Sequence, residues 1–280
     1  MRPLAIVAQH PRIAFGACVL ALMLIAALAA PWLAPHDPQE QDLLNSFQLP
    51  VWSGGDASHA LGTDSLGRDI LSRLIFSTRP ALIVAFVAAL CAGILGTALG
   101  LAAGYFGGRV DSAISRLVDI WMSFPSVLLC IVLAAVLGAG LHTVVIAIII
   151  IDWTRFCRVV RAETMVQKSQ DYVASALTFG LKPGRIVASE ILPNVAPLLL
   201  TLFTLEMGIA IVVEAILSFV GLSVSSGAPT WGGIIQEGRL YVNQAWWLMA
   251  LPMACIIIAV LGLNALGDGL RAALDPVKSR

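Results

Sequence analysis

Residues 171–194, which read DYVASALTFGLKPGRIVASEILPN, form a polar insert between two long apolar stretches of the chain. The first half predicts one short helix, with Asp171 as its N-cap and Gly180 as its C-terminal stop. Small side chains in the middle of this helix would let another protein approach the backbone closely, and these are Ala174, Ser175 and Ala176. We therefore expect a docking helix that meets a soluble partner.

The composition indicates a membrane protein. Hydrophobic residues make up 59% of the chain and charged residues 12%, whereas soluble domains carry about 25% charged residues. Apolar runs of the length that crosses a hydrocarbon core of about 30 Å predict six spans, at approximately 13–33, 81–105, 120–139, 142–160, 195–221 and 245–266. The fold class we expect is an all-α integral membrane protein with six transmembrane helices. The fourth span is the least clear, because Asp152, Arg155 and Arg158 follow its short apolar part.

The placement of lysine and arginine predicts the orientation. With the N-terminus inside, the cytoplasmic segments hold Arg2, Arg12, Arg109, Arg116, Arg155, Arg158, Arg161, Lys168, Lys182, Arg185, Arg271, Lys278 and Arg280. The outside holds only Arg68, Arg73, Arg79 and Arg239. This bias predicts that both termini and the polar insert are cytoplasmic. The first span is expected to be a retained anchor, because its apolar core is longer than the roughly 7–15 residues of a removable signal.

Cysteine and histidine are spread along the chain. The five cysteines lie one per predicted span or span end, which favours neither a disulfide framework nor a zinc site: Cys18, Cys91, Cys130, Cys157 and Cys255. The four histidines are equally scattered, so no metal site built from this chain is expected: His10, His36, His59 and His142. No lysine follows a glycine, so the sequence also offers no P-loop for ATP.

Two carboxylates, Glu206 and Glu214, lie inside the fifth predicted span. A carboxylate inside a span is costly and usually faces the bundle interior or water. The spacing of eight residues places both on roughly the same helix face. They line either a substrate pathway or an interhelical interface, and for Glu214 we favour a hydrogen-bonding role at an interface.

The segment LGTDSLGRDILSR, residues 61–73, predicts a turn followed by a short amphipathic helix with Ile70, Leu71 and Leu74 on its apolar face. Its polar side chains are expected to be solvated charges that cap and pair within that helix. The positions that define the segment are Gly62, Thr63, Asp64, Gly67, Arg68, Asp69, Ser72 and Arg73.

These motifs together resemble one protein family. Residues 171–194, with Ile186 and Pro193, resemble the cytoplasmic EAA loop of ABC importer permeases, although Ala174 stands where that motif has glutamate. Residues 61–73 closely resemble the LGTDxxGRDxxSR signature of the second (C-type) subunit of dipeptide, oligopeptide and nickel importers. Three further strings follow in the order of that subfamily: GYFGGRVD (104–111), EAILSFVGL (214–222) and NALGDGLRAALDP (264–276).

The resemblance implies a type I ABC importer permease fold. Its expected parts are a cytoplasmic stub with the first helix (1–33), a periplasmic segment with an amphipathic helix (34–80), the permease domain (78–268, coupling loop about 161–194) and a cytoplasmic tail (269–280). It assigns the ATPase-coupling role to Asp171, Tyr172, Ala174, Ser175, Ala176, Gly180, Ile186 and Pro193.

The function implied is that of a non-catalytic, multi-pass subunit of an ATP-driven importer in the bacterial inner membrane, carrying small peptides. Import of nickel or another small solute is the alternative, and a secondary transporter driven by an ion gradient is a distant one. The chain is expected to need no cofactor of its own, since ATP and Mg²⁺ would be bound by partners. Those partners are a homologous permease in a heterodimer, two cytoplasmic ATPase subunits, a periplasmic solute-binding protein and membrane lipid, without nucleic acid.

Overall fold

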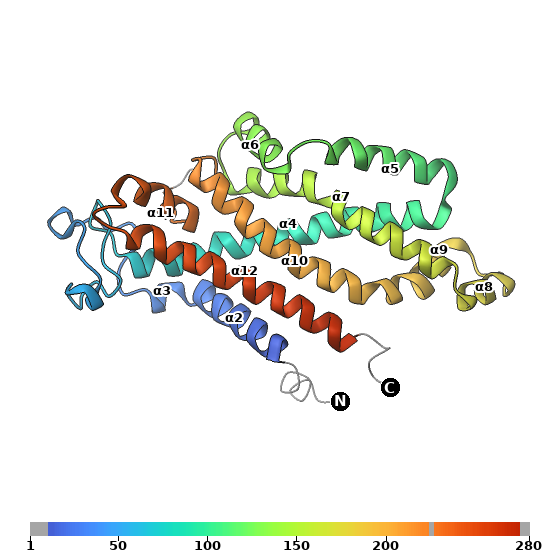
Figure 1. Cartoon of the computed structure of the whole chain (residues 1–280), viewed down its shortest axis with the longest axis horizontal. Coiled ribbons are helices and arrows are strands. Elements are labelled where there is room, and N and C mark those ends of the chain that lie inside the picture. The colour runs from blue at the N-terminus through green and yellow to red at the C-terminus, as the bar shows by residue number, and fades with distance from the viewer. Residues whose placement is uncertain (1–10, 224–226, 275–280) are drawn as a thin grey trace.

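The computed structural model describes residues 11–223 and 227–274, and over these residues the chain is helical (Figure 1). Its α-helices are α2 (Pro11–Leu28), α3 (Ala30–Leu33), α4 (Ile70–Phe106), α5 (Gly108–Met122), α6 (Ser126–Leu137), α7 (Leu141–Lys168), α8 (Asp171–Thr178), α9 (Pro183–Ile186), α10 (Leu192–Phe219), α11 (Trp231–Gly238) and α12 (Trp247–Leu274). Short 3₁₀ turns occupy Leu43–Asn45, Val51–Ser53 and Arg239–Tyr241, and a π-helical turn, Val187–Ile191, joins α9 to α10. The described ranges contain no β-strand, so the all-α prediction is confirmed. The expectations for Arg2, Lys278, Arg280 and the 275–280 end of the tail lie outside the described residues.

Within residues 11–223 and 227–274, four helical segments are long and apolar enough to cross a membrane: α2, α4, the continuous stretch Pro183–Phe219, and α12. A fifth results if the bent pair α5 and α6 counts as one span. Helix α7 has 28 residues but carries charged side chains in its middle, which keeps it out of this set. The count of six spans and the sides of the termini therefore stay predictions.

The prediction of a separate amphipathic helix before the second span is wrong. Helix α4 instead continues for 37 residues, with Pro80 in its interior. Pro80 has no N–H to donate to the Phe76 carbonyl oxygen, so one helix hydrogen bond is lost there, yet the helix continues on both sides. Ile70 and Leu74 are buried, as their apolar-face assignment requires.

The predicted third span, 120–139, is not one straight helix. Helix α5 ends at Met122, and α6 begins at Ser126 after a bend of 82°. Pro125 is the N-cap residue of α6, where its missing N–H costs nothing. At 12 residues α6 is about 18 Å long, too short to cross a membrane alone.

Helices α4 and α7 lie against each other over much of their length, and glycines on α4 allow this contact. A Cβ atom at Gly96, Gly100 or Gly104 would lie 2.3–2.7 Å from a backbone carbonyl oxygen of α7. Small residues spaced four apart let two membrane helices approach at backbone distance. This glycine spacing therefore positions α7 and the helices that precede and follow it, α6 and α8.

The ends of the molecule differ in kind. Helices α8 and α9 lie at one end, and the loop segment between α3 and α4 lies at the other, beside α11 (Figure 1). Helices α4, α10 and α12 run between the two ends, and α2 packs along α12.

Candidate coupling helix and polar cavity

The predicted docking helix is present as α8. Gly180 has a left-handed backbone (φ +74°), a conformation that glycine adopts without strain. The Leu181 N–H donates to the Ala176 carbonyl oxygen at 3.2 Å and the Gly180 N–H to that of Leu177 at 3.0 Å. This pair of bonds is the Schellman C-cap. Gly180 therefore ends the helix as predicted.

The start of α8 differs from the prediction. Gln170, with an extended backbone, is the N-cap residue, and its side chain makes no capping hydrogen bond. Asp171 is the first helical residue. Its carboxylate still lies at the favourable end of the helix dipole, because it is in the first turn.

One face of α8 packs on the molecule and the other faces outward. Val173 is fully buried and Ala176 is 6% exposed, in a cluster with Leu101, Tyr105, Ile186, Ile191 and Val195. Ala174 and Ser175 are exposed, and Phe179, just beyond the helix, is 85% exposed. Of the three small residues expected to allow close approach of a partner, Ala174 and Ser175 face outward, whereas helical periodicity turns Ala176 toward the core.

Polar contacts connect α8 to its neighbours. The Tyr172 hydroxyl donates to Gln167 Oε1 at 2.6 Å and accepts from Asn194 Nδ2 at 3.4 Å. Partial burial raises the pKa of the Tyr172 phenol above its usual value, so the group stays a neutral donor. Among the other predicted coupling residues, Ile186 is buried in the same cluster and Pro193 is exposed at the start of α10.

The 61–73 segment is organised around Asp64 at the opposite end. Asp64 Oδ1 accepts from the backbone N–H groups of Leu66 and Arg68 at 2.9 and 3.0 Å. Gly62 and Gly67 have φ values of +78° and +72°, which explains glycine at both turns. Asp69 caps α4 by accepting from the Ser72 N–H at 2.8 Å, as its predicted capping role requires.

The expectation that these charges are solvated is wrong. Asp64 is 1% exposed and Arg73 is 3% exposed. The Arg73 guanidinium contacts Asp64 and also Glu237 of α11, with Nη1 to Oε2 at 2.7 Å. Arg68 bridges the same two carboxylates, each at 2.7 Å. Glu237 lies 164 residues from Arg73, and no sequence pattern pointed to it.

A second buried polar cluster lies where α7 meets α10. Glu206 is 1% exposed, and its Oε2 atom lies 3.2 Å from Arg155 Nη1. Asp152, also buried, lies 4.0 Å from the same nitrogen. The Asn264 side-chain oxygen is buried and has no hydrogen-bond partner among the described residues.

Asp152, Arg155 and Asn264 of this cluster line a cavity of about 450 Å³ between α6, α7, α10 and α12, which Glu206 meets only through its contact with Arg155. Asp152, Arg155 and Asn264 were not among the predicted site residues. Charged residues following an apolar helical run were the available signal. The charge pattern of the sequence assigns Arg155 to a cytoplasmic segment. Its contact with the buried Glu206 depends on the tertiary fold.

Glu214 lies apart from this cluster, although it shares α10 with Glu206. Its Oε1 atom accepts from the Ser218 hydroxyl at 2.6 Å and the Ser223 hydroxyl at 3.0 Å. Both partners come from its own helix or the turn that follows. Glu214 does form hydrogen bonds, but those in the described residues are local rather than interhelical, and its role at an interface stays a prediction.

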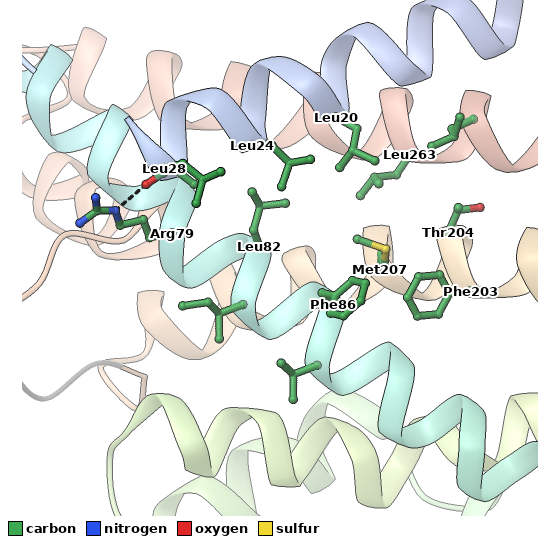
Figure 2. A pocket seen from close by; sticks show the side chains of 14 residues that line it. Leu20, Leu24, Leu28, Arg79, Leu82, Phe86, Phe203, Thr204, Met207 and Leu263 are labelled. Carbon is green, nitrogen blue, oxygen red and sulfur yellow. Dashed lines mark hydrogen bonds between the residues drawn. The ribbon is translucent and has the colours of Figure 1, made fainter. Parts of the chain in front are cut away.

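A second cavity, of about 770 Å³, is a poor candidate for a polar substrate. Leu20, Leu24 and Leu28 of α2 face Leu82 and Phe86 of α4 across it (Figure 2). Arg79, its only charged lining residue, donates from Nε to the Ala27 carbonyl oxygen at 2.6 Å. An apolar groove of this kind suits lipid chains or an apolar helix better than a peptide backbone.

The structure of this chain is similar to a chain of the MetNI methionine ABC transporter in an inward-facing conformation. The TM-score is 0.60, at 20% identity, over 73% of this chain and 97% of the other. At that identity the similarity establishes the fold, which is that of a type I ABC importer permease.

Sequence comparison identifies closer relatives. The chain is 41% identical to the di/tripeptide transport system permease protein DppC of Pseudomonas aeruginosa, over 95% of this chain and 89% of the relative. It is 37% identical to the probable D,D-dipeptide transport system permease protein DdpC of Escherichia coli, over 93% and 86%. It is 38% identical to the glutathione transport system permease protein GsiD of Pectobacterium atrosepticum, over 96% and 87%.

Residues 8–50 match the N-terminal transmembrane domain of oligopeptide transport permease C. Residues 96–280 match the binding-protein-dependent transport system inner membrane components. The chain therefore belongs to this family of multi-pass inner-membrane permeases of ABC importers.

Proposed function

We propose that this chain is one of two permease subunits that carry small peptides inward, driven by ATP hydrolysis on separate subunits docked at α8. The observation that carries the proposal is the exposed outer face of α8, which ends in Phe179 at 85% exposure. A large apolar side chain that projects from a rigid helix end is a typical interface anchor. The family membership supports the same assignment.

The connections of α8 suggest how ATPase movement reaches the substrate path. Two residues separate α7 from α8, and α8 shares an apolar cluster with the start of α10. A push on α8 would therefore shift α7 relative to α10. That shift would change the contact between Arg155 and Glu206, which lie beside the polar cavity.

Peptides suit this cavity because it presents both signs of charge. Asp152 and Arg155 both line it, and a short peptide carries a free amino group and a free carboxylate. The names of the relatives support peptides over nickel as the substrate class. A homologous permease would complete the path, a solute-binding protein would deliver the peptide, and two ATPases would engage the two coupling helices.

The docking surface can be tested with Phe179→Ala in the tagged chain, expressed in its native host, where the ATPase subunits are also produced. Truncating a central anchor costs about 2 kcal/mol, which corresponds to roughly 30-fold weaker binding. We expect much less ATPase subunit to co-purify, and uptake of a radiolabelled dipeptide to fall with it.

Leu44→Ala is the matched control for co-purification. Leu44 is 96% exposed and lies in the segment between α3 and α4, at the end of the molecule opposite α8 (Figure 1). Recovery of the ATPase should match the wild type in this variant. Equal recovery with Phe179→Ala would remove α8 as the docking site.

A further inference from the structure

Two histidines and an aspartate that are far apart in the sequence meet at the end of the molecule opposite α8. One ligand atom from each of His36, His59 and Asp69 lies within 4.8 Å of the others. His59 Nδ1 is 3.1 Å from Asp69 Oδ1, and His36 Nδ1 is 3.9 Å from Asp69 Oδ2. We propose that these three side chains form a binding site for a divalent transition-metal ion of the Zn²⁺ type, independent of peptide transport through the cavity.

The donor set fits such an ion. Two imidazole nitrogens and one carboxylate oxygen are the protein ligands of an open zinc site, with water as the fourth ligand. Zn²⁺ bonds of about 2.0–2.1 Å place tetrahedral donors roughly 3.4 Å apart. His59 Nδ1 and Asp69 Oδ1, at 3.1 Å, already lie close to that distance, and the separations that involve His36, at most 4.8 Å, need to close by up to about 1.4 Å. The His36 side chain is 33% exposed and can make that movement.

His36 gives an independent indication of a missing ligand. Its Nδ1 atom is buried and has no hydrogen-bond partner among the described residues. A buried ring nitrogen without a partner is unfavourable. A metal ion at this point would coordinate it.

The surroundings already orient the carboxylate for binding. Asp69 Oδ2 accepts from the Ser72 N–H at 2.8 Å and the Ser72 hydroxyl at 2.7 Å, so that Oδ1 is directed toward His59. The same Ser72 hydroxyl accepts from the backbone N–H of His36 at 3.1 Å. Hydrogen bonds of this kind hold metal-ligating side chains in their working orientation.

A simple hydrogen bond between His59 and Asp69 explains only part of the arrangement. It accounts for two of the three side chains and leaves the buried His36 Nδ1 unpartnered. A bound ion accounts for all three. It would also tie two points of the segment between α3 and α4 to the start of α4, and so stabilise the fold of that segment.

The test uses the full chain, purified in its complex with a tag that contains no histidine. After dialysis against Zn²⁺ and removal of free metal, bound zinc is measured by mass spectrometry. We expect about one zinc per wild-type chain, and at least a tenfold loss of affinity in His36→Ala and in His59→Gln. Asp69→Asn can still cap α4 through its amide oxygen and should weaken binding as well.

His142→Ala is the matched control, because His142 lies in the first turn of α7, far along the chain from the cluster. It should bind zinc as the wild type does. Thermal unfolding gives the second readout, since zinc should raise the midpoint of the wild type but not of His36→Ala. Absence of stoichiometric zinc in the wild type would overturn the proposal. Zinc binding as tight in both histidine variants as in the wild type would overturn it too.

Discussion

Arg155 and Glu206 show why single charged residues matter in an apolar protein. Glu206 is almost fully buried, whereas the Arg155 side chain is 34% exposed. A buried ion pair contributes little net stability, but removal of one partner leaves an uncompensated charge. The pair is therefore sensitive to single substitutions and tolerant of paired ones.

Arg155→Met should destabilise the protein by about 3 kcal/mol, the lower end of the range for broken buried pairs, because it leaves the buried Glu206 without its cation. The double variant Arg155→Met/Glu206→Met should regain part of that stability, since the carboxylate of Glu206 is then absent and only Asp152 has lost its partner. Thermal unfolding of the purified protein in detergent measures both effects. A double variant no more stable than Arg155→Met would contradict this account.

Another arginine–carboxylate pair, which lies on the surface, provides the control. Arg158 and Asp119 lie 3.0 Å apart, with side chains 54% and 68% exposed. Exposed pairs contribute about 0–1 kcal/mol. Asp119→Ala should therefore leave the unfolding temperature nearly unchanged.

At the scale of helices, the glycine spacing of α4 decides how closely α7 approaches. A Cβ atom at Gly100 would lie 2.7 Å from the Cys157 carbonyl oxygen, which cannot move without the helix. Because α7 carries Asp152 and Arg155 and leads into α8, its distance from α4 affects both the cavity and the position of α8.

Gly100→Ala should lower the free energy of unfolding by about 1–3 kcal/mol, the usual cost of overpacking. Gly208→Ala is the control, because its added Cβ would meet Asn264 and Val260 at 3.5–3.9 Å, which is ordinary contact. Denaturation of both variants in the same detergent tests the difference. Equal stability of the two would mean that α7 moves away from α4 without cost.

At the scale of the whole molecule, Arg73 and Glu237 join parts of the chain that are distant in the sequence. Their contact connects the start of α4 to α11, and Asp64 adds the loop before α4. Arg68 bonds to the same carboxylates, so the network consists of two cations and two anions. This network fixes the end of the molecule opposite α8.

Arg73→Ala should loosen that end, because Asp64 and Glu237 would then share only Arg68. We expect faster amide hydrogen exchange in residues 61–73 and in α11, with exchange in α8 unchanged. Arg109→Ala, at an exposed arginine of α5, should show no such change. Unaltered exchange in Arg73→Ala would show that the network contributes nothing to local stability.

The fold class, the family and the position of α8 could be predicted from the sequence. Runs of apolar residues determined the all-helical membrane fold, since a bilayer leaves backbone groups few other ways to be satisfied. The family, and the position of helix α8 with its stop at Gly180, could be predicted from local sequence motifs. Such features depend on residues close together in the chain, which is why a linear pattern contains them.

The tertiary structure decided the rest. Only the fold showed that Ala176 faces inward, that Arg155 reaches Glu206, that Arg73 meets Glu237, and that His36 and His59 meet at Asp69. The sequence shows which residues are charged but not which residues they contact in the folded chain. Burial and pairing depend on how α4, α7, α10 and α11 pack, and that packing brings together residues separated by up to 164 positions.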